Sequence, residues 1–307
     1  MYYLGVDIGG TSIKAGVVDQ TGRILKSNHI PTIVDDLDRL VLSLAQLIQT
    51  FQNEFVFTAI GMGIPGLLNS RTQKVRTSPN IPCLKDAALG ASISQNAGLP
   101  VVAANDANAA AYAEFTCGHG RGLQHMAFLT LGTGLGSGVI LNGKLFTGIS
   151  GYAVEFGHAI AEIDGRPCSC GNHGCFETLV SATGMVVTAQ ELMKNKAGST
   201  LHALNKPLTS ELIFEAASAG DATSLTVFER TGKYLGMACA SLINIFDLEL
   251  ISIGGGVIAA GEMLLGPARI EAARRALKPS FEDCRIVQSQ LGPDAGIIGA
   301  AMLARDR

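Results

Sequence analysis

Residues 2–30 read YYLGVDIGGTSIKAGVVDQTGRILKSNHI, and this stretch decides the fold class. Apolar segments at 2–8, 13–18 and 23–30 are separated by polar, glycine-containing turns. Such segments, bounded by Gly, Asp, Ser and Thr, are typical of β-strands joined by tight hairpins. The sequence therefore predicts three consecutive strands and two hairpins at the start of the chain.

The same order returns near the middle of the chain. An apolar run at 126–131 is followed by the glycine-rich segment 132–138, by apolar residues 139–141 and by a second hairpin before 144–146. Two matching halves indicate a duplicated fold, whose two glycine turns could face each other across a cleft. Because glycine hairpins are common in β-containing proteins, chance similarity is the alternative.

The segments between and after these halves complete an α/β pattern. We predict a helix at 35–51, strands at 58–64, 99–104 and 248–253, and a closing helix at 295–304. A chain of 307 residues is long enough for two domains. We expect a smaller α/β domain at 1–116, with the closing helix 295–307 packed on it, and a larger α/β domain at 117–294.

Composition and charge limit the possible partners. The formal net charge is −3 and no basic run is present, so we expect no nucleic-acid partner. No apolar run reaches the ~18 residues of a membrane span, and the N-terminus lacks signal-peptide features, so we expect a cytoplasmic protein without a membrane partner. Glycine is abundant, with 37 residues, which suggests tight turns or close approach of the backbone to a bound molecule.

Three of the seven cysteines lie close together and follow a histidine. His158, Cys168, Cys170 and Cys175 offer one nitrogen and three sulfur ligands, the set that a tetrahedral zinc ion prefers. Four protein ligands leave no open position, so such a zinc would be structural. Reduced, unliganded cysteines in a loop are the alternative, and His173 is a competing ligand. We interpret the other cysteines as small buried hydrophobic residues: Cys83, Cys117, Cys239 and Cys284.

Three glycine clusters at the ends of apolar strands could contact a phosphorylated ligand. The first, Asp7-Ile8-Gly9-Gly10-Thr11-Ser12-Ile13-Lys14, combines a carboxylate, exposed backbone N–H groups and a cation, which suit a magnesium-bound polyphosphate. The others are residues 132–138 and Gly254-Gly255-Gly256. Each alone is equally typical of an ordinary turn.

Asp106 has two interpretations. It could cap the helix that begins near Ala107. It could instead act as a general base at a strand end and accept a proton from a hydroxyl that attacks phosphorus, with Asn105 holding that hydroxyl. The spacing of residues leaves both open.

Glu155 and Glu177 flank the cysteine segment on either side. Glutamates at such positions are usually only solvated. A zinc loop that fixes Glu155, His158 and Glu177 could, however, build a rigid polar pocket for a polyhydroxylated ligand.

Together these segments resemble the ROK family (repressors, open reading frames, kinases), and specifically its bacterial glucokinase-like sugar kinases. The resemblance extends over nearly the whole chain. It rests on Asp7 to Thr11, Asn105-Asp106, Leu131 to Gly138, Glu155-Phe156-Gly157-His158, Cys168 to Glu177, and Gly254 to Val257. It implies a two-lobed, actin-like (ribonuclease H-like) ATPase fold with the active site in a cleft between the lobes.

The resemblance also implies roles for individual residues. Asp106 would be the catalytic base. The sugar would be bound by Gly66, Asn80, Asn105, Asp106, Glu155, His158 and Glu177. The nucleotide and its magnesium would be bound by Asp7, Gly9, Gly10, Thr11, Lys14, Gly132, Thr133, Gly134, Gly254, Gly255 and Gly256. Zinc would be held by His158, Cys168, Cys170 and Cys175, and His158 would turn its second ring nitrogen toward the sugar.

The implied function is phosphorylation of a hexose by ATP, with Mg²⁺ and a structural Zn²⁺, most simply glucose at its 6-hydroxyl. A kinase for N-acetylmannosamine, allose or another hexose is the alternative within the family, and the resemblance suggests a homodimer. Regulators of the family begin with a DNA-binding winged helix, and we expect none here because the first strand starts at Tyr2. A cytoskeletal or chaperone-like ATPase would leave the zinc ligands unexplained.

Val154 departs from the family pattern, which commonly has glycine directly before the Glu of Glu-x-Gly-His. A β-branched residue does not easily take a positive φ. We therefore expect the loop that carries Glu155 to be shaped differently, with an effect on sugar specificity.

Overall fold

The structure, a computed structural model, describes residues 1–194 and 198–307. These residues pack into two compact units. Unit 1 comprises Met1–Gln124, Gly138–Val154 and Gln290–Arg307, and unit 2 comprises His125–Ser137 and Glu155–Ser289. The domain boundaries at 116/117 and 294/295 stay a prediction, because residues that pack together need not fold as one domain.

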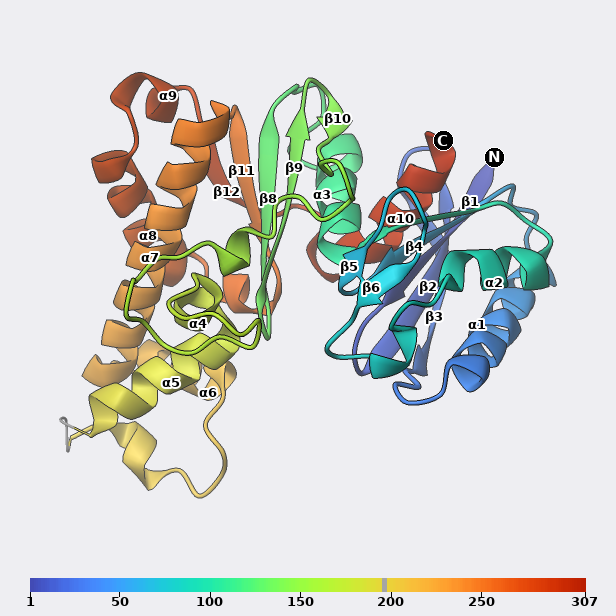
Figure 1. Cartoon of the computed structure of the whole chain (residues 1–307). Coiled ribbons are helices and arrows are strands. Elements are labelled where there is room, and N and C mark those ends of the chain that lie inside the picture. Colours follow the sequence, from blue (N-terminus) through green and yellow to red (C-terminus); the bar gives the residue numbers. More distant parts are fainter. Residues whose placement is uncertain (195–197) are drawn as a thin grey trace. The chain divides into compact units, whose positions relative to one another are not determined.

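Unit 1 is built on a five-stranded sheet of order β3-β2-β1-β4-β7 (Figure 1). Its strands are β1 (Tyr2–Ile8), β2 (Ser12–Asp19), β3 (Ile24–Pro31), β4 (Ile60–Ile64) and β7 (Val101–Asn105). The first three strands pair antiparallel, which confirms the predicted hairpins, and β4 and β7 run parallel to β1. The other elements are α1 (Leu37–Gln52), β5 (Leu67–Leu68), β6 (Val75–Thr77), α2 (Leu89–Ala97), α3 (Asp106–Cys117) and α10 (Ala295–Arg305).

Helices cover both faces of this sheet. Successive residues of a strand point to opposite faces, so β1 contributes to two cores. Leu4, Val6 and Ile8 pack with the apolar residues of α1 and α2, whereas Tyr3 packs with those of α10. Figure 1 shows α1 and α2 on one side of the sheet and α3 and α10 on the other.

Helix α10 packs closely against the sheet and against helix α3 because three glycines leave room for neighbouring backbone. A Cβ atom at Gly5 would lie 1.9 Å from the carbonyl oxygen of Ile297, and one at Gly61 would lie 1.7 Å from that of Ala300. At Gly299 of the helix itself, a Cβ would lie 1.7 Å from the carbonyl oxygen of Ala109 in α3. Part of the glycine excess therefore serves helix packing rather than turns or ligand contact.

A second five-stranded sheet has the order β10-β9-β8-β11-β12. Its strands are β8 (Met126–Leu131), β9 (Leu135–Leu141), β10 (Lys144–Leu145), β11 (Leu250–Gly254) and β12 (Arg285–Gln288). β11 runs parallel to both β8 and β12. Two sheets with the same order and the same parallel additions confirm the predicted duplication.

Helices make up most of unit 2 beyond its strands. They are α4 (Glu177–Val180), α5 (Ala182–Met193), α6 (Ser210–Ser218), α7 (Ala222–Phe246), α8 (Glu262–Arg275) and α9 (Lys278–Glu282). The long helix α7 packs against α8, α5, α6 and α4. The polar segment between β10 and α4 contains the predicted metal ligands.

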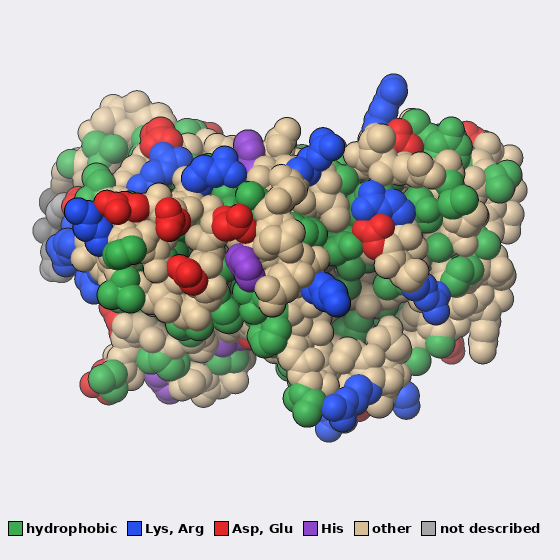
Figure 2. All heavy atoms as spheres, turned by 90° about the horizontal axis from the view of Figure 1, so that it is seen from above, with side chains coloured by type: hydrophobic (Ala, Val, Ile, Leu, Met, Phe, Trp, Pro, Cys, Tyr) green, Lys and Arg blue, Asp and Glu red, His purple; other side chains and the backbone are tan. Residues whose placement is uncertain are grey.

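Charged side chains of both signs are interspersed on one face of the molecule. On the face shown in Figure 2, Lys and Arg side chains lie among Asp and Glu side chains, and neither sign forms a continuous area. Among the described residues, no helix is both long enough and apolar enough to cross a bilayer.

Candidate functional site

Two acidic residues of unit 1 meet where neighbouring parallel strands end. Asp7 of β1 pairs in register with Gly63 of β4, and the next residue of β4 pairs with Asn105 of β7. A Cβ atom at Gly63 would lie 3.7 Å from Asp7 Oδ1 and 3.5 Å from Asp106 Cα. The missing side chain of Gly63 thus leaves space between the two acids, at the edge where α/β sheets bind ligands.

The surroundings of both carboxyl groups favour their protonated forms. Burial and, to a smaller extent, the nearby Asp106 raise the pKa of Asp7 to about 6, against the opposing effect of Lys14. Burial also raises the pKa of Asp106, and hydrogen bonds, including one from the Ala107 N–H to its Oδ1 (2.9 Å), oppose this rise. A cation beside the pair would favour ionisation of both.

Asn105, not Asp106, caps helix α3. The Oδ1 atom of Asn105 accepts a hydrogen bond from the Asn108 N–H (3.1 Å), and Asp106 is the first residue of the helix. The interpretation of Asp106 as the cap is therefore wrong. Because an N-cap accepts from an N–H three residues on, Asn105 has the right spacing. The Asp106 carboxylate remains available for chemistry.

The turns around this edge bring further predicted residues together. Asn105 Nδ2 donates to the carbonyl oxygen of Gly66 (3.1 Å). Gly66 has φ +103°, and a Cβ there would lie 2.1 Å from the carbonyl oxygen of Thr77, so only glycine fits. A Cβ at Gly10 would lie 3.2 Å from the Cβ of Asn80.

The first glycine turn is a tight hairpin whose outer side is exposed. The Gly9 N–H donates to the carbonyl oxygen of Ser12 (3.0 Å), and the Thr11 carbonyl accepts from the Thr32 N–H (3.0 Å). Gly10 and Thr11 are exposed. Lys14 stands opposite Asp7 in the β1–β2 register. Unit 1 therefore gathers Asp7, Gly9, Gly10, Thr11, Lys14, Gly66, Asn80, Asn105 and Asp106 at one end of its sheet.

In unit 2, the second glycine turn is held by the start of α5 and by Glu177. The carbonyl oxygen of Gly132 accepts from the Ala182 N–H (2.9 Å), and that of Thr133 accepts from Thr183 Oγ1 (2.8 Å). Glu177 Oε2 accepts from the Leu135 N–H (3.0 Å), and a Cβ at Gly134 would lie 2.3 Å from that oxygen. Glu177 is thus a hydrogen-bonded residue, not a merely solvated one.

The third glycine cluster follows β11. A Cβ at Gly254 would lie 2.7 Å from the Phe128 ring, and one at Gly255, whose φ is +88°, would lie 2.2 Å from the carbonyl oxygen of Leu131. Packing against β8 therefore requires the first two glycines. At the third glycine of this cluster, Gly256, a Cβ would meet nothing within 4 Å, which leaves backbone open to a ligand.

Residues 158–176, the metal loop, bring the four predicted metal ligands together. The ligand atoms of His158, Cys168, Cys170 and Cys175 all lie within 4.8 Å of one another. Cys170 Sγ lies 3.7 Å from Cys175 Sγ, and His158 Nδ1 lies 3.6 Å from Cys168 Sγ. With Zn–S bonds of about 2.3 Å and Zn–N bonds of about 2.0 Å, a tetrahedron requires about 3.8 Å and about 3.5 Å for these pairs. The donor set and its spacing therefore fit zinc.

The residues beside this cluster have distinct positions. Nδ1 of His158 faces the sulfur atoms, so Nε2 is the second ring nitrogen. Glu177 Oε1 lies 3.5 Å from Ser169 Oγ. Glu155 is exposed and directly precedes the short 3₁₀-helix Phe156–His158. His173 is not in the cluster that the described residues form.

Two of the remaining cysteines differ from the expectation. Cys239 and Cys284 are buried, as expected, but Cys83 and Cys117 are only half-buried. The prediction that all four are buried is therefore wrong for these two. Burial raises the pKa of the Cys284 thiol to about 12.

Val154 takes a backbone conformation that suits glycine. Its φ is +64°, in the left-handed region, so the expectation that valine would avoid this region is wrong. The preceding loop is held by hydrogen bonds from the Ala153 N–H to the Thr147 carbonyl (3.1 Å) and from the Ser70 N–H to the Ser150 carbonyl (2.9 Å). Such a conformation of a β-branched residue costs about 1–3 kcal/mol, which the surrounding contacts must offset.

Two residues that the sequence analysis did not single out contact the predicted site residues or the metal loop. Thr183 donates to Thr133, as above, and Arg166 holds the metal loop through several hydrogen bonds. The sequence offers only one signal for Arg166, which is its place two residues before Cys168. Nothing in the sequence marks Thr183.

Comparison with known proteins gives consistent matches over the whole chain. A sequence model of the ROK family matches residues 3–307. The glucokinase of Thermotoga maritima is 36% identical over 309 residues, covering 99% of this chain and 97% of the relative. An N-acetylmannosamine kinase of Haemophilus influenzae is 29% identical, covering 100% and 96%. A ROK family glucokinase from Streptomyces griseus, solved in complex with glucose and AMPPNP, has a TM-score of 0.88 and 34% identity, with 100% of both chains covered.

Proposed function

This chain belongs to the ROK family, and we propose that it is a sugar kinase that transfers the γ-phosphoryl group of ATP to the 6-hydroxyl of glucose. Its fold is the actin-like ATPase fold of its structural relatives, as predicted. The observation that carries the proposal is the pair formed by Asp106 and Asp7 at the ends of β7 and β1, the two strands that flank β4. The glucokinases that resemble the chain along its whole length support glucose as the sugar.

In the proposed reaction, Asp106 is the general base. Its carboxylate accepts the proton of the 6-hydroxyl while that oxygen forms a bond to the γ-phosphorus. The bond from the γ-phosphorus to the oxygen bridging it to the β-phosphate breaks, and ADP leaves. Asp106 suits this role because Asn105 caps α3 in its place, so the Asp106 carboxylate, which accepts a hydrogen bond from the Ala107 N–H, is not needed as the cap.

The nucleotide would contact both glycine turns. We assign to it Asp7, Gly9, Gly10, Thr11 and Lys14 in unit 1, and Gly132, Thr133, Gly134 and Gly254 to Gly256 in unit 2. The AMPPNP bound to the Streptomyces griseus relative supports ATP as the donor. Mg²⁺ would neutralise phosphate charge when bound, and the Asp7 carboxylate, with its raised pKa, is a ligand whose ionised form such a cation stabilises.

The sugar would be bound by Gly66, Asn80, Asn105, Glu155, His158 and Glu177. The metal loop would hold a structural zinc through His158 Nδ1 and three cysteine sulfurs, which leaves His158 Nε2 for a sugar hydroxyl. All four ligand positions are taken by protein atoms, so the zinc would fix the loop and take no part in the chemistry. The homodimer that the family resemblance implies stays a prediction.

The zinc proposal predicts about one zinc ion per chain in active protein. Replacing Cys168 with serine removes a ligand, and we expect the zinc content to fall and backbone amides of residues 158–176 to exchange faster. The melting temperature of the whole protein should change little, because the core of unit 2 lies outside this loop. Elemental analysis and hydrogen exchange measure these effects, and Cys83→Ser is the control. Active wild-type protein without zinc would contradict the proposal.

The substrate proposal is tested by a coupled ADP-release assay with glucose, mannose, allose and N-acetylmannosamine. We expect the highest kcat/KM for glucose, and phosphorus–proton correlation spectra should place the new phosphate on O6. A higher kcat/KM for N-acetylmannosamine than for glucose would show that N-acetylmannosamine is the preferred substrate. ATP turnover independent of sugar, or retention of DNA in a low-salt shift assay without kinase activity, would contradict a sugar kinase.

A further inference from the structure

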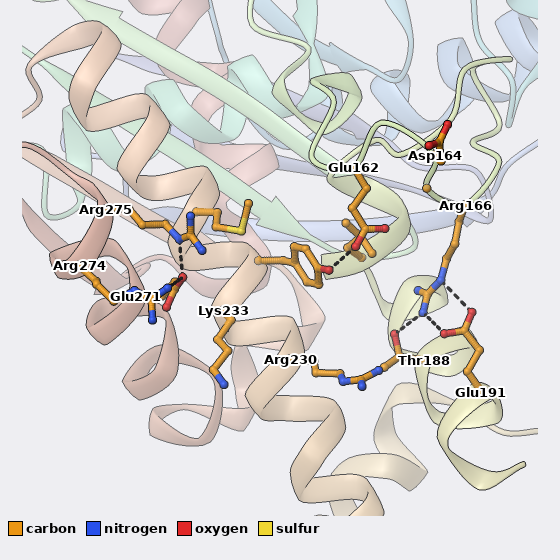
Figure 3. Close-up of a pocket in the computed structure, with 14 residues that line it drawn as sticks. Glu162, Asp164, Arg166, Thr188, Glu191, Arg230, Lys233, Glu271, Arg274 and Arg275 are labelled. Atoms are coloured by element: carbon orange, nitrogen blue, oxygen red, sulfur yellow. Dashed lines mark hydrogen bonds and ion pairs between the residues drawn. The ribbon is translucent and has the colours of Figure 1, made fainter. Parts of the chain in front are cut away.

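Arg166 lies in the metal loop and lines the pocket drawn in Figure 3. Its side chain is 19% exposed although it carries a full positive charge. Glu191 of α5 neutralises this charge through two parallel bonds, from Nε to Oε1 (3.1 Å) and from Nη2 to Oε2 (2.6 Å). Such a two-pronged pair fixes the plane of the guanidinium as well as its position.

The remaining donors of Arg166 reach three other groups. Nη1 donates to the carbonyl oxygens of Thr178 (2.8 Å) and Gly184 (3.1 Å), and Nη2 donates to Thr188 Oγ1 (3.0 Å). A guanidinium has five N–H donors, and the side chain makes five hydrogen bonds. Figure 3 shows the bonds to Thr188 and Glu191.

These bonds join the metal loop to the helix that begins with Glu177. Thr178 follows Glu177 directly in α4, and its N–H donates to the carbonyl oxygen of Cys175 (3.0 Å). Within the loop, the Arg166 carbonyl accepts from the Gly174 N–H (2.8 Å). Arg166 therefore connects the loop to the first turn of α4 and to three successive turns of α5.

A second side-chain contact connects the same loop to α7. Tyr234 of α7 donates one hydrogen bond to Glu162, as Figure 3 shows. Among the described residues, Arg166 is the cation that spans the loop, α4 and α5 together. The loss of its side chain would remove the bond to the Thr178 carbonyl. It would leave Glu177 attached to the loop through the chain from Cys175 and through the contacts of its Oε1 with Ser169 Oγ (3.5 Å) and Cys168 Sγ (3.8 Å).

We propose that Arg166 is a positioning residue for the sugar site, holding the metal loop against α4 and α5 and thereby fixing Glu177. The inference rests on the proposed function, because Glu177 is a sugar ligand only if the chain is a sugar kinase. Arg166 itself does not touch the sugar. Lysine would not substitute for it, because an ammonium lacks the planar fork that reaches all these acceptors.

The test compares Arg166→Ala with wild type and with Arg269→Ala. Arg269 is a control in unit 2, since its Nη1 donates to both carboxylate oxygens of Glu262 and its Nε donates to the backbone carbonyl of Ile286. For Arg166→Ala we expect the KM for glucose to rise between about 10-fold and 100-fold, with kcat changed less than about threefold. Guanidinium ion at millimolar concentration should partly restore the KM, and Arg269→Ala should keep the wild-type KM.

A second readout does not depend on activity. In Arg166→Ala, amides of residues 159–180 should exchange faster, and the zinc content should stay at the wild-type level. An unchanged KM with unchanged exchange in these residues would overturn the proposal. If Arg166→Ala does not fold, Glu191→Gln is the substitute variant, because it weakens the same contacts. Its KM for glucose should rise about threefold. An unchanged KM in Glu191→Gln would also overturn the proposal. Wild type that phosphorylates no sugar would instead refute the proposed function, and faster exchange in Arg166→Ala would still show the loop contact.

Discussion

Replacing Asp106 with asparagine is expected to lower kcat by about 10³-fold or more, with a much smaller change in the KM for either substrate. A general base contributes about 10²–10⁴-fold to the rate, and asparagine does not accept the proton. The amide oxygen can still accept the hydrogen bond that Ala107 donates to Asp106 (2.9 Å), so the geometry of α3 should persist. Steady-state kinetics by ADP release measures the effect.

The stability of the same variant separates loss of chemistry from loss of fold. Burial raises the pKa of Asp106 above its ordinary value, so ionising it costs folding energy. The cost is absent when the pH is below the pKa that Asp106 has in the unfolded protein. It grows as the pH rises toward the higher pKa of Asp106 in the folded protein, and it is complete above that value. Asp106→Asn should therefore melt at or above the wild-type temperature at pH 8. Asp86→Asn, which alters an exposed ion pair with Arg76 (2.9 Å), is the control for activity.

The pH profile of the wild type gives an independent check. Asp7 has a pKa of about 6, and its ionisation is coupled to that of Asp106. The fall of kcat/KM at acidic pH therefore reports the titration of the two carboxyl groups together. We expect activity to fall at a pH above the ordinary range of aspartate, as the base becomes protonated. A profile that stays flat down to pH 4.5, or an Asp106→Asn variant with wild-type kcat, would contradict the assignment of Asp106 as the base.

Replacing Gly61 with alanine should destabilise the protein by about 3 kcal/mol or more, or prevent folding. The new Cβ would lie 1.7 Å from the carbonyl oxygen of Ala300 and 2.3 Å from its carbon, and backbone atoms do not yield as the end of a flexible side chain does. Helix α10 would have to move away from β4, which would loosen its contacts with β1 and α3. Urea denaturation followed by circular dichroism measures the change.

Gly90→Ala is the matched control for this substitution. Gly90 lies in helix α2 of the same unit, and a Cβ there would meet Val101 Cγ1 at 3.5 Å and Ala103 Cβ at 3.6 Å, which is ordinary contact. Because alanine favours helices over glycine by up to about 1 kcal/mol, this variant should be as stable as wild type or more stable. Equal denaturation midpoints for the two variants would contradict the close approach of α10.

Local sequence patterns predicted the elements and the metal ligands. The three opening strands and helix α1 followed from apolar spacing, because a strand or helix buries one face at a fixed period. The ligand set of His158, Cys168, Cys170 and Cys175 followed from residue chemistry within a short segment, where a loop can bring its own residues together. The repeated strand order also followed from the repeated pattern.

Features that depend on exact backbone geometry could not be predicted from the sequence. Asp106 and Asn105 are neighbours and both are common helix caps, so only the hydrogen bond to the Asn108 N–H shows which of them caps α3. Val154 has φ +64° because the hydrogen-bonded loop before it imposes that conformation against its own preference. In both cases the surrounding structure overrides a local propensity.

What the sequence by itself determined is the order of strands, the duplicated pattern, and the four candidate metal ligands, because these follow from local spacing and residue type. Only the tertiary structure decided what is brought together from distant segments. It placed Asp7 beside Asp106 across Gly63, joined Arg166 to α4 and α5, and showed that Gly5, Gly61 and Gly299 admit the backbone of a neighbouring helix. A glycine needed for a turn and one needed for close packing look alike in sequence, since the atoms that would collide with a side chain belong to residues far along the chain.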